Sequence, residues 1–382
     1  MMANPRPRGI IDNLVIGGGP AGSMVAMRLT DAGRKVVLLE KEPGAHHKVC
    51  GEFLSHESVD YLHQAGVNPS KLGAAVIHSV RLSTNCKFVE AALPFPALSL
   101  SRRVLDAALL SAAEEKGCDV RRGAYVESLT FQGDSWRVGL RGSEPLYART
   151  VFLANGKHDL HGWNRISRRQ SDLVGFKLHW QLDQASTEAL RGLIELFLFR
   201  GGYGGLSLVE GDVANLCLVV QRLRLQELGG WTNLLAAILG KNRHLQQYLQ
   251  GAFPLWQRPL AISPIPYGYL AGRPCNVWCV GDQAAVIPSF TGDGMSIALH
   301  SAALATQMYL AGNSIDEYNN RLHAQLSRAI SLATLLSRTM VTDIGRNLAS
   351  LGLILVPNAM QWIAASTRIP ERALLTNPVP IK

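Results

Sequence analysis

Three glycines near the N-terminus have the spacing of a loop that binds phosphate. Gly17, Gly19 and Gly22 form G-x-G-x-x-G directly after an apolar run. The first glycine permits a tight turn, the second lets a pyrophosphate approach the backbone, and the third lets the following helix pack on the strand. Glu40 closes the next apolar run, 21 residues after Gly19, where a carboxylate can bind a ribose diol. These features predict a dinucleotide site, because a glycine turn in another α/β unit would leave Glu40 unexplained.

The segment that follows Glu40 is expected to lie beside the dinucleotide. Residues 46–54 have the sequence H-H-K-V-C-G-E-F-L. The first residues of this segment are too polar for a core strand, so the segment is predicted to form a loop. This position makes Lys48 and Cys50 candidate cofactor contacts, with a small buried thiol as the alternative role of Cys50. His46 and His47 are expected to lie in solvent and not to bind a metal.

A second pair of signals lies near residue 280. Gly281 and Asp282 end an apolar run with a carboxylate, which is a position suited to bind hydroxyl groups of a ligand. Gly292 and Gly294 then precede a long apolar stretch that predicts a helix. The N-terminal amides of such a helix would point toward the same ligand.

The middle of the chain predicts a second sheet with its own candidate site. Residues 172–222 are read as long strands, and four glycines surround Tyr203 in the run 201–205 that joins two of these strands. Glycine weakens a strand and often marks close approach by another group, so we expect a bare surface for a flat ligand, bordered by Tyr203 and Gly204. The alternative is a wide hairpin loop in solvent. Tyr203, His78 and His179 are the candidates for catalysis, and none is assigned as a general base.

The composition describes a globular chain without a recognisable metal site. Of 382 residues, 47% are hydrophobic and 18% are charged. The six cysteines are scattered, and Cys275 and Cys279 have no second pair to complete a zinc site, so we expect reduced thiols, no metal and a cytoplasmic protein. The N-terminus lacks the apolar core of a signal peptide, and no apolar run is long enough to span a bilayer.

The charge pattern limits the choice of partners. The net charge is +9. This charge indicates either a solvated basic surface or a surface that attracts an anionic partner, such as a nicotinamide dinucleotide, an acidic carrier protein or a membrane. Basic residues do not cluster with aromatic ones, so no nucleic-acid partner is expected. The apolar stretch 347–365, broken at Pro357, predicts helices over the substrate region or a surface for peripheral membrane contact.

The elements that must position these residues are interleaved along the chain. We predict an α/β fold in which a Rossmann-like cofactor domain is built from residues 1–75, 99–160 and 272–325. An antiparallel-sheet substrate domain is expected from residues 76–98 and 161–271, and a C-terminal helical segment from 326–382.

Three separated motifs together resemble one family. The glycine loop with Glu40, Arg102 four residues before Asp106, and Gly281-Asp282 followed by T-G-D-G-M look like the FAD-dependent monooxygenases of the para-hydroxybenzoate hydroxylase fold. Geranylgeranyl reductases and flavin-dependent halogenases share this fold, and the resemblance covers most of residues 10–310.

The resemblance implies bound FAD and a set of contacts to it. By analogy Asp282 would bind the ribityl chain, Arg102 the phosphate and ribityl region, and Val126 the adenine. The amides from Gly292 to Met295 would face the pyrimidine edge of the flavin. The expected cofactor contacts are Gly17, Gly19, Pro20, Ala21, Gly22, Glu40, Lys41, Lys48, Cys50, Arg102, Val126, Gly281, Asp282, Gly292, Gly294 and Met295.

The resemblance implies an oxidoreductase and leaves its reaction open. The leading expectation is a hydroxylase of an aromatic, polyketide-type or other secondary metabolite, which acts through a flavin C4a-hydroperoxide with NADH or NADPH as transient reductant. The alternative is reduction of a C=C bond in a lipophilic or carrier-tethered substrate, which the Cys50-Gly51 pair favours. The halogenase motif W-x-W-x-I-P is absent, and the D-G motif linked to nicotinamide use is replaced by A-N-G-K-H-D at 154–159. A non-catalytic flavin-binding protein is the remaining alternative.

Overall fold

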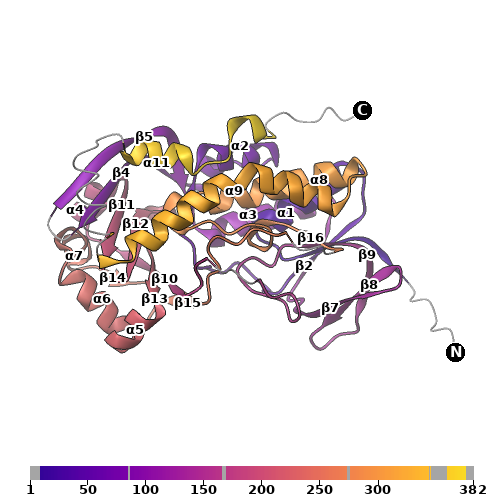
Figure 1. Cartoon of the computed structure of the whole chain (residues 1–382), viewed down its shortest axis with the longest axis horizontal. Coiled ribbons are helices and arrows are strands. Elements are labelled where there is room, and N and C mark those ends of the chain that lie inside the picture. Colours follow the sequence, from indigo (N-terminus) through magenta and orange to yellow (C-terminus); the bar gives the residue numbers. More distant parts are fainter. Residues whose placement is uncertain are drawn as a thin grey trace.

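The fold consists of two sheets with helices packed on and between them. The computed structural model describes residues 9–84, 87–165, 169–272, 276–343, 345 and 359–375. One sheet carries the glycine loop, and the other is built largely from the middle of the chain (Figure 1). The architecture is the predicted α/β fold with a Rossmann-like cofactor domain.

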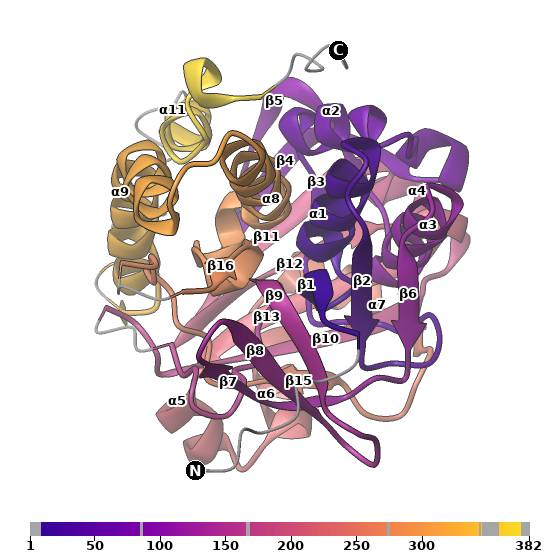
Figure 2. The same ribbon diagram turned by 90° about the vertical axis from the view of Figure 1, so that its right-hand side faces the viewer.

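The first sheet is mainly parallel and places the glycine loop at the end of a central strand. Its strand order is β6-β2-β1-β9-β8-β7, with β16 beside β9 (Figure 2). The strands are β1 (Ile11–Ile16), β2 (Val36–Glu40), β6 (Asp119–Arg122), β7 (Val126–Gln132), β8 (Ser135–Leu140), β9 (Leu146–Leu153) and β16 (Trp278–Cys279). β1 pairs in parallel with both β2 and β9. Both of its edges are therefore paired, and its second half is a continuous buried apolar run.

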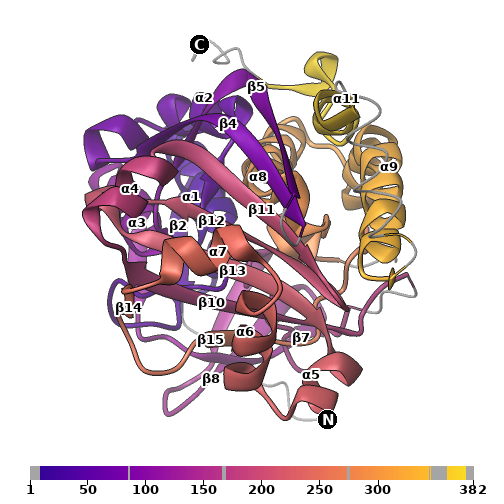
Figure 3. The same ribbon diagram turned by 90° about the vertical axis from the view of Figure 1, so that its left-hand side faces the viewer.

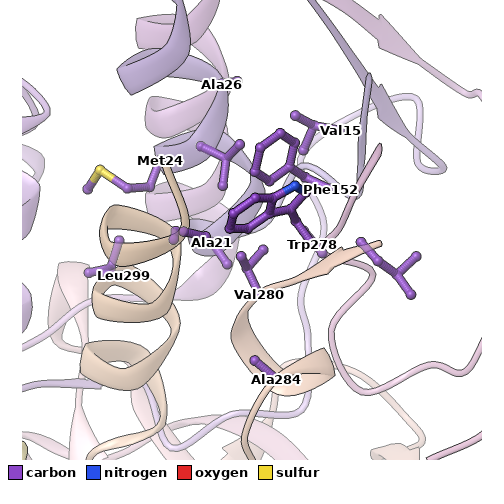
Figure 4. Close-up of a cluster of buried hydrophobic side chains, with 14 of the residues drawn as sticks. Val15, Ala21, Met24, Ala26, Phe152, Trp278, Val280, Ala284 and Leu299 are labelled. Carbon is purple, nitrogen blue, oxygen red and sulfur yellow. The ribbon is translucent and has the colours of Figure 1, made fainter. Parts of the chain in front are cut away.

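Two helices from distant parts of the chain cover one face of this sheet. Helix α1 (Pro20–Asp31) starts directly after the glycine loop with proline in its first turn, where the missing N–H costs nothing. Helix α8 (Gly294–Leu310) packs beside it. Figure 4 shows Met24 of α1 and Leu299 of α8 packed with Phe152 and Trp278 from the sheet, and these two rings stack at 5.9 Å between centroids. The core therefore joins residues near 20, 150 and 280.

The second sheet is antiparallel except where β11 lies parallel to β4. Its order is β14-β10-β13-β12-β11-β4-β5-β3, with β15 beside β10. The strands are β3 (Phe53–Leu54), β4 (Ala75–Thr84), β5 (Lys87–Ser99), β10 (Leu173–Gln181), β11 (Gly192–Phe199), β12 (Gly202–Leu208), β13 (Ala214–Gln221), β14 (Phe253–Pro254) and β15 (Leu260–Ile262).

The remaining helices surround the two sheets. Helices α5, α6 and α7 lie against the outer face of the second sheet (Figure 3). Their bounds, with those of α2, α3 and α4, are α2 (His56–Gln64), α3 (Arg102–Glu115), α4 (Gln184–Leu190), α5 (Arg222–Leu228), α6 (Trp231–Leu239) and α7 (Arg243–Leu249). Short 3-10 turns are η1 (Pro69–Leu72), η2 (Glu210–Asp212), η3 (Gly281–Gln283), η4 (Ser289–Thr291) and η5 (Glu371–Ala373).

The glycine-rich run around Tyr203 forms the start of strand β12. The alternative interpretation of this run, a wide hairpin loop in solvent, is therefore wrong. Phe199 pairs with Gly202, and only two residues connect β11 to β12. Tyr203 is buried, and its ring meets Phe290 edge-on at 5.8 Å. Because side chains alternate across a strand, Tyr203 and Gly205 face inward toward the first sheet, whereas Gly204 faces the outer core.

The C-terminal part of the chain closes one side of the molecule. Helix α9 (Ile315–Met340) starts with a capping box between Ser314 and Glu317 and lies beside α8 (Figure 2). Helix α11 (Ala359–Ser366) lies against β5. Of the apolar stretch 347–365, only the part from 359 onward lies within the described residues. None of the described helices is long and apolar enough to cross a membrane.

The position of Gly204 corrects the expectation that it borders the substrate. A Cβ there would lie 2.4 Å from the Phe197 ring and 2.7 Å from Leu218 in the outer core. Gly204→Ala should therefore lower the free energy of unfolding by about 1–3 kcal/mol, the usual cost of overpacking a core. Gly205→Ala is the matched control, because its Cβ meets Leu196 only at 3.3 Å. Urea unfolding of both variants checks this, and equal stability would refute the assignment of faces.

Candidate FAD and substrate site

The glycine loop has one position where the protein itself leaves space. A Cβ on Gly17 would lie 2.4 Å from the Ala154 carbonyl oxygen, and one on Gly22 would lie 1.8 Å from the Gly17 oxygen. These two glycines are required by the contact between strand and helix. A Cβ on Gly19 would meet only Arg102, at 3.2 Å. The space in front of Gly19 therefore fits a ligand that approaches the backbone, as a pyrophosphate does.

Glu40 holds the loop from the end of β2. Its Oε2 accepts a hydrogen bond of 2.7 Å from the Gly18 amide, and its Oε1 accepts one from the Glu42 amide. The neighbouring Lys41 is exposed and lies 3.7 Å from Glu42. A small cleft opens beside Glu40, lined by Gly18, Glu40, Gly44, Ala45, His46, Lys48, Asp106, Ala107, Leu110 and Arg122. This cleft provides a carboxylate within reach of a ribose.

Arg102 and Lys48 share one buried carboxylate beside Gly19. Arg102 donates two hydrogen bonds to Asp106, at 2.7 and 2.8 Å, and Lys48 donates one at 2.9 Å. Burial alone would raise the pKa of Asp106, but the two cations outweigh it and hold this pKa below its usual value. Two cations thus share Asp106, and Glu40 at Gly18 brings a second carboxylate to the loop, so these charges balance. Arginine in the first turn of α3 opposes the helix dipole, and an anionic cofactor offsets that cost.

The turn that carries Asp282 lies against the first turn of α1. Gly281 has a left-handed backbone, with φ +61°, and a Cβ there would approach Ala21 to 3.0 Å. Asp282 is therefore held near the glycine loop, and Lys157 Nζ lies 3.5 Å from its carboxylate. The pKa of Lys157 is raised chiefly by Asp282. Lys157 was not among the expected contacts, although it follows β9 within the unusual A-N-G-K-H-D run.

The T-G-D-G-M loop forms the start of α8 next to β3. Gly292 has φ +76°, and a Cβ there would collide with the Phe53 ring at 2.6 Å. Gly294 has nothing within 4 Å of its Cβ position, and Met295 is buried. The loop therefore presents open backbone at Gly294. Val126, the residue expected at the adenine, starts β7 and is 9% exposed.

Asp293 of the same loop is a buried acid with weak compensation. It is 1% exposed, and neither carboxylate oxygen has a hydrogen-bond partner among the described residues. Arg368 lies 3.7 Å away, but it is already bound to Glu57 at 2.6 Å and stacked on Phe95. Burial therefore raises the pKa of Asp293 to about 7, against the smaller opposite effect of Arg368.

The inner face of the second sheet meets the loop 46–54. Asn215 of β13 donates a hydrogen bond to the Cys50 carbonyl, and Val49 lies over Gly175 of β10. Lys177 and His179 of β10 both bind the carboxylate of Glu52. Cys50 thus lies where the cofactor loop, the sheet and α3 meet.

The three candidates for catalysis are not brought together. His179 is on the inner face and bound to Glu52, 2.9 Å away. Tyr203 is on the same face, but its hydroxyl is buried against Ser337 of α9 at 3.4 Å, and burial raises its pKa well above the usual value. His78 is exposed on β4, several strands from β10. His47, expected in solvent, is half-buried against the His179 ring.

Comparisons with known proteins agree with this geometry. Residues 11–151 match the model of an FAD-binding domain. The chain is 24% identical to conditioned medium factor receptor 1 of Dictyostelium discoideum over 86% of its length and 70% of the relative. It is 25% identical to digeranylgeranylglycerophospholipid reductase 2 of Methanopyrus kandleri, over 80% of the chain and 78% of the relative. A menaquinone reductase of Mycobacterium tuberculosis is 24% identical, over 78% of this chain and 76% of the relative.

Solved structures show the same fold. The myxobacterial chondrochloren halogenase superimposes with a TM-score of 0.75 at 20% identity, covering 96% of this chain and 93% of its own. A geranylgeranyl bacteriochlorophyll reductase-like protein of Thermoplasma acidophilum superimposes with a TM-score of 0.74 at 18% identity, and the match covers 96% of each chain. The chain therefore has the fold of these structures, and residues 11–151 of it match an FAD-binding domain. The expected fold is thereby confirmed, and the expected FAD cofactor agrees with the matched domain.

The contrast between Gly19 and Gly22 gives a test of the cofactor site. Gly19→Ala should leave the melting temperature unchanged, because its Cβ meets only the movable end of Arg102, and should weaken FAD binding at least tenfold, about 1.4 kcal/mol. Gly22→Ala should lower the melting temperature itself, because its Cβ would overlap the Gly17 oxygen. Flavin fluorescence titration and thermal unfolding measure the two effects. Native FAD affinity in Gly19→Ala would remove the pyrophosphate from this position.

Asp293 predicts a pH dependence of stability. Between its unfolded pKa near 4 and its folded pKa of about 7, the folded chain keeps a proton that the unfolded chain releases, so the free energy of unfolding falls as pH rises. Asp293→Asn removes this loss. Without added FAD, the variant should therefore gain about 2–4 kcal/mol relative to the native chain between pH 4 and pH 8. Asp134→Asn, on the exposed β7–β8 turn, serves as the control, and parallel stability curves for Asp293→Asn and native protein would contradict the prediction.

Proposed function

We propose that this protein is an FAD-dependent reductase that hydrogenates a carbon–carbon double bond of a lipophilic substrate. The observation that carries the proposal is the apolar inner face of the second sheet, beside the T-G-D-G-M loop. On this face Leu198, Tyr203 and Val219 pack with Ile265, Tyr267 and Val286, with Leu82 at the border of this cluster, and Gly205 leaves the backbone bare beside Leu196. Such a wall suits a hydrocarbon chain and excludes water from the reacting bond.

The residues around the glycine loop fit FAD, and each would contact a different part of the cofactor. Gly19 leaves space for the pyrophosphate, Arg102 and Lys48 supply positive charge, and Glu40 offers acceptors to the ribose. Asp282 would accept hydrogen bonds from the ribityl hydroxyls, and Lys157 would balance its charge. When bound, FAD supplies the two-electron chemistry, and we propose NADH or NADPH as its reductant. The chain's own part is to hold the cofactor against the apolar wall.

Two of the relatives support reduction over hydroxylation. Their names describe reductases of a digeranylgeranyl phospholipid and of menaquinone, which are both lipophilic compounds. The match extends over more than three quarters of this chain in each case, so it includes the second sheet as well as the cofactor domain. The reductase proposal therefore agrees with the apolar wall and with the relatives.

Hydroxylation of an aromatic or polyketide-type substrate is the second candidate. It is favoured by the fold shared with a halogenase that was solved with phloroglucinol and FAD, because phloroglucinol is a small aromatic ring. Tyr203 and Phe290 would offer such a ring an aromatic neighbour. In that reaction the substrate gains an oxygen atom from O2, whereas the reductase adds two hydrogens.

Anaerobic turnover separates these candidates. FAD-loaded protein is mixed with NADH or NADPH and either a menaquinone or a geranylgeranyl lipid, and the products are weighed by mass spectrometry. The reductase proposal expects a gain of two hydrogens per bond without O2. Products that form only with O2 and carry an added oxygen would replace it by the second candidate. No product under either condition would refute both substrate classes.

Gly205 tests whether the substrate lies on the inner face. Gly205→Leu places a side chain beside Leu196 without reaching any cofactor contact, so it should lower kcat/KM at least tenfold while FAD content stays native. Leu223→Ala, at an exposed site on α5, is the control. Unchanged kcat/KM in Gly205→Leu would place the substrate elsewhere.

A further inference from the structure

A buried charged cluster joins the cofactor loop to the second sheet. Glu52 and Lys177 have no exposed surface, and His179 is 3% exposed. The Glu52 carboxylate accepts hydrogen bonds from Lys177, from His179 Nε2 and from the Arg102 amide. Burial alone would raise the pKa of Glu52, but the His179 hydrogen bond and the Lys177 charge outweigh it and leave this pKa below its usual value. Glu52 is therefore an anion that fixes His179 with its proton on Nε2.

His47 connects this cluster to the outside of the molecule. Its ring lies 4.8 Å from the His179 ring and 4.8 Å from the Trp256 ring, and the His179 and Trp256 rings are 5.0 Å apart. His47 is half-buried, and its Nδ1 has no hydrogen-bond partner in the described part of the chain. Burial and the nearby Lys177 lower the pKa of His47 to about 4. At neutral pH His47 is thus an uncharged imidazole that can accept a proton at one nitrogen and release one from the other.

The same atoms have the spacing of a metal site, but their hydrogen bonds exclude that role. One ligand atom each from His47, Glu52 and His179 lies within 4.8 Å of the others. Both Glu52 oxygens already accept hydrogen bonds, and one of the donors is the ammonium group of Lys177. A divalent ion would have to displace a buried cation from its only carboxylate among the described residues. This separation would leave room for one water molecule to bridge the two histidines.

We propose that His47, His179, Glu52 and Lys177 form a proton relay from solvent to the inner face of the second sheet. His47 takes a proton from solvent and passes it through His179 and Glu52 to Lys177. Lys177 faces the same side as its strand partner Cys217, next to the loop of Cys50. The relay is therefore a path to the place where the proposed function needs a proton.

The relay would supply the proton that the proposed reduction consumes, so this role of the relay rests on the proposed function. Hydrogenation of a C=C bond breaks its π bond and forms two C–H bonds. When bound, reduced FAD would supply the hydride, and the proposed nicotinamide nucleotide would in turn reduce FAD. The proton for the second carbon comes from Lys177, which regains it through Glu52 and His179, and His47 restores the chain from water. General acid assistance of this kind contributes about 10²–10⁴-fold to a rate.

Proton conduction along the relay can be measured without substrate or turnover. Nitrogen-15 NMR of histidine side chains reports how fast the His179 Nε2 proton exchanges with water. In the native FAD-loaded protein this exchange should be fast, and His47→Gln should slow it at least tenfold. His78→Gln is the matched control and should leave it unchanged, because His78 is exposed on a distant strand. An unchanged exchange rate in His47→Gln would overturn the relay, whatever the substrate proves to be.

A second measurement tests what the relay delivers. Protein reduced with dithionite is mixed with menadione, which takes up a hydride and a proton, or with ferricyanide, which takes up electrons only. His47→Gln and His179→Gln should react at least tenfold more slowly with menadione and at the native rate with ferricyanide. Added imidazole should restore the menadione rate of a His179→Gly variant. If both acceptors slow equally, the cluster is structural and the relay fails, whereas failure to hydrogenate lipids would refute only the proposed function.

Discussion

The Glu52 carboxylate is the contact on which the arrangement of the site depends. It lies between the two sheets and binds the first amide of α3 on one side and two side chains of β10 on the other. Removing one partner of a buried ion pair leaves an uncompensated charge and costs about 3–5 kcal/mol. A second carboxylate, Glu210, reaches the same helix end and accepts from both the amide and the hydroxyl of Ser101. The start of α3, and Arg102 with it, is thus fixed from the substrate side.

The charges around the glycine loop follow one rule. The cations described around this loop have carboxylate partners: Arg102 binds Asp106, and the partly exposed Lys157 lies 3.5 Å from Asp282. With Glu40 at Gly18, two carboxylates match the two cations Arg102 and Lys48 at this point. The site that we propose for the pyrophosphate is thus held by side-chain contacts of the chain itself, so little rearrangement would oppose binding there.

The sequence predicted features that depend on local spacing and missed those that depend on long-range pairing. The glycine loop was predictable because the steric demands of a strand, a turn and a helix act within six residues. The Glu52–Lys177–His179 cluster was not, because its members are 125 residues apart and meet only when β10 crosses the loop 46–54. Around Tyr203, the error was to place the glycines in a connection. Once they form a strand, the alternation of side chains assigns Gly204 and Gly205 to opposite faces. Only the unusual A-N-G-K-H-D motif at 154–159 pointed to Lys157, and that motif alone does not predict a contact with Asp282.

The packing of Arg368 has a consequence for how the protein is made. This residue binds Glu57 and lies beside Asp293, so the segment after α11 forms part of the wall behind the T-G-D-G-M loop. The Tyr61 hydroxyl adds to this wall by accepting a hydrogen bond from the Leu375 amide. The glycine loop leaves the ribosome early, but the wall behind the flavin loop cannot form until residues 359–375 have been synthesised. If the flavin binds at this loop, as we propose, its site would be complete only after most of the chain has been synthesised.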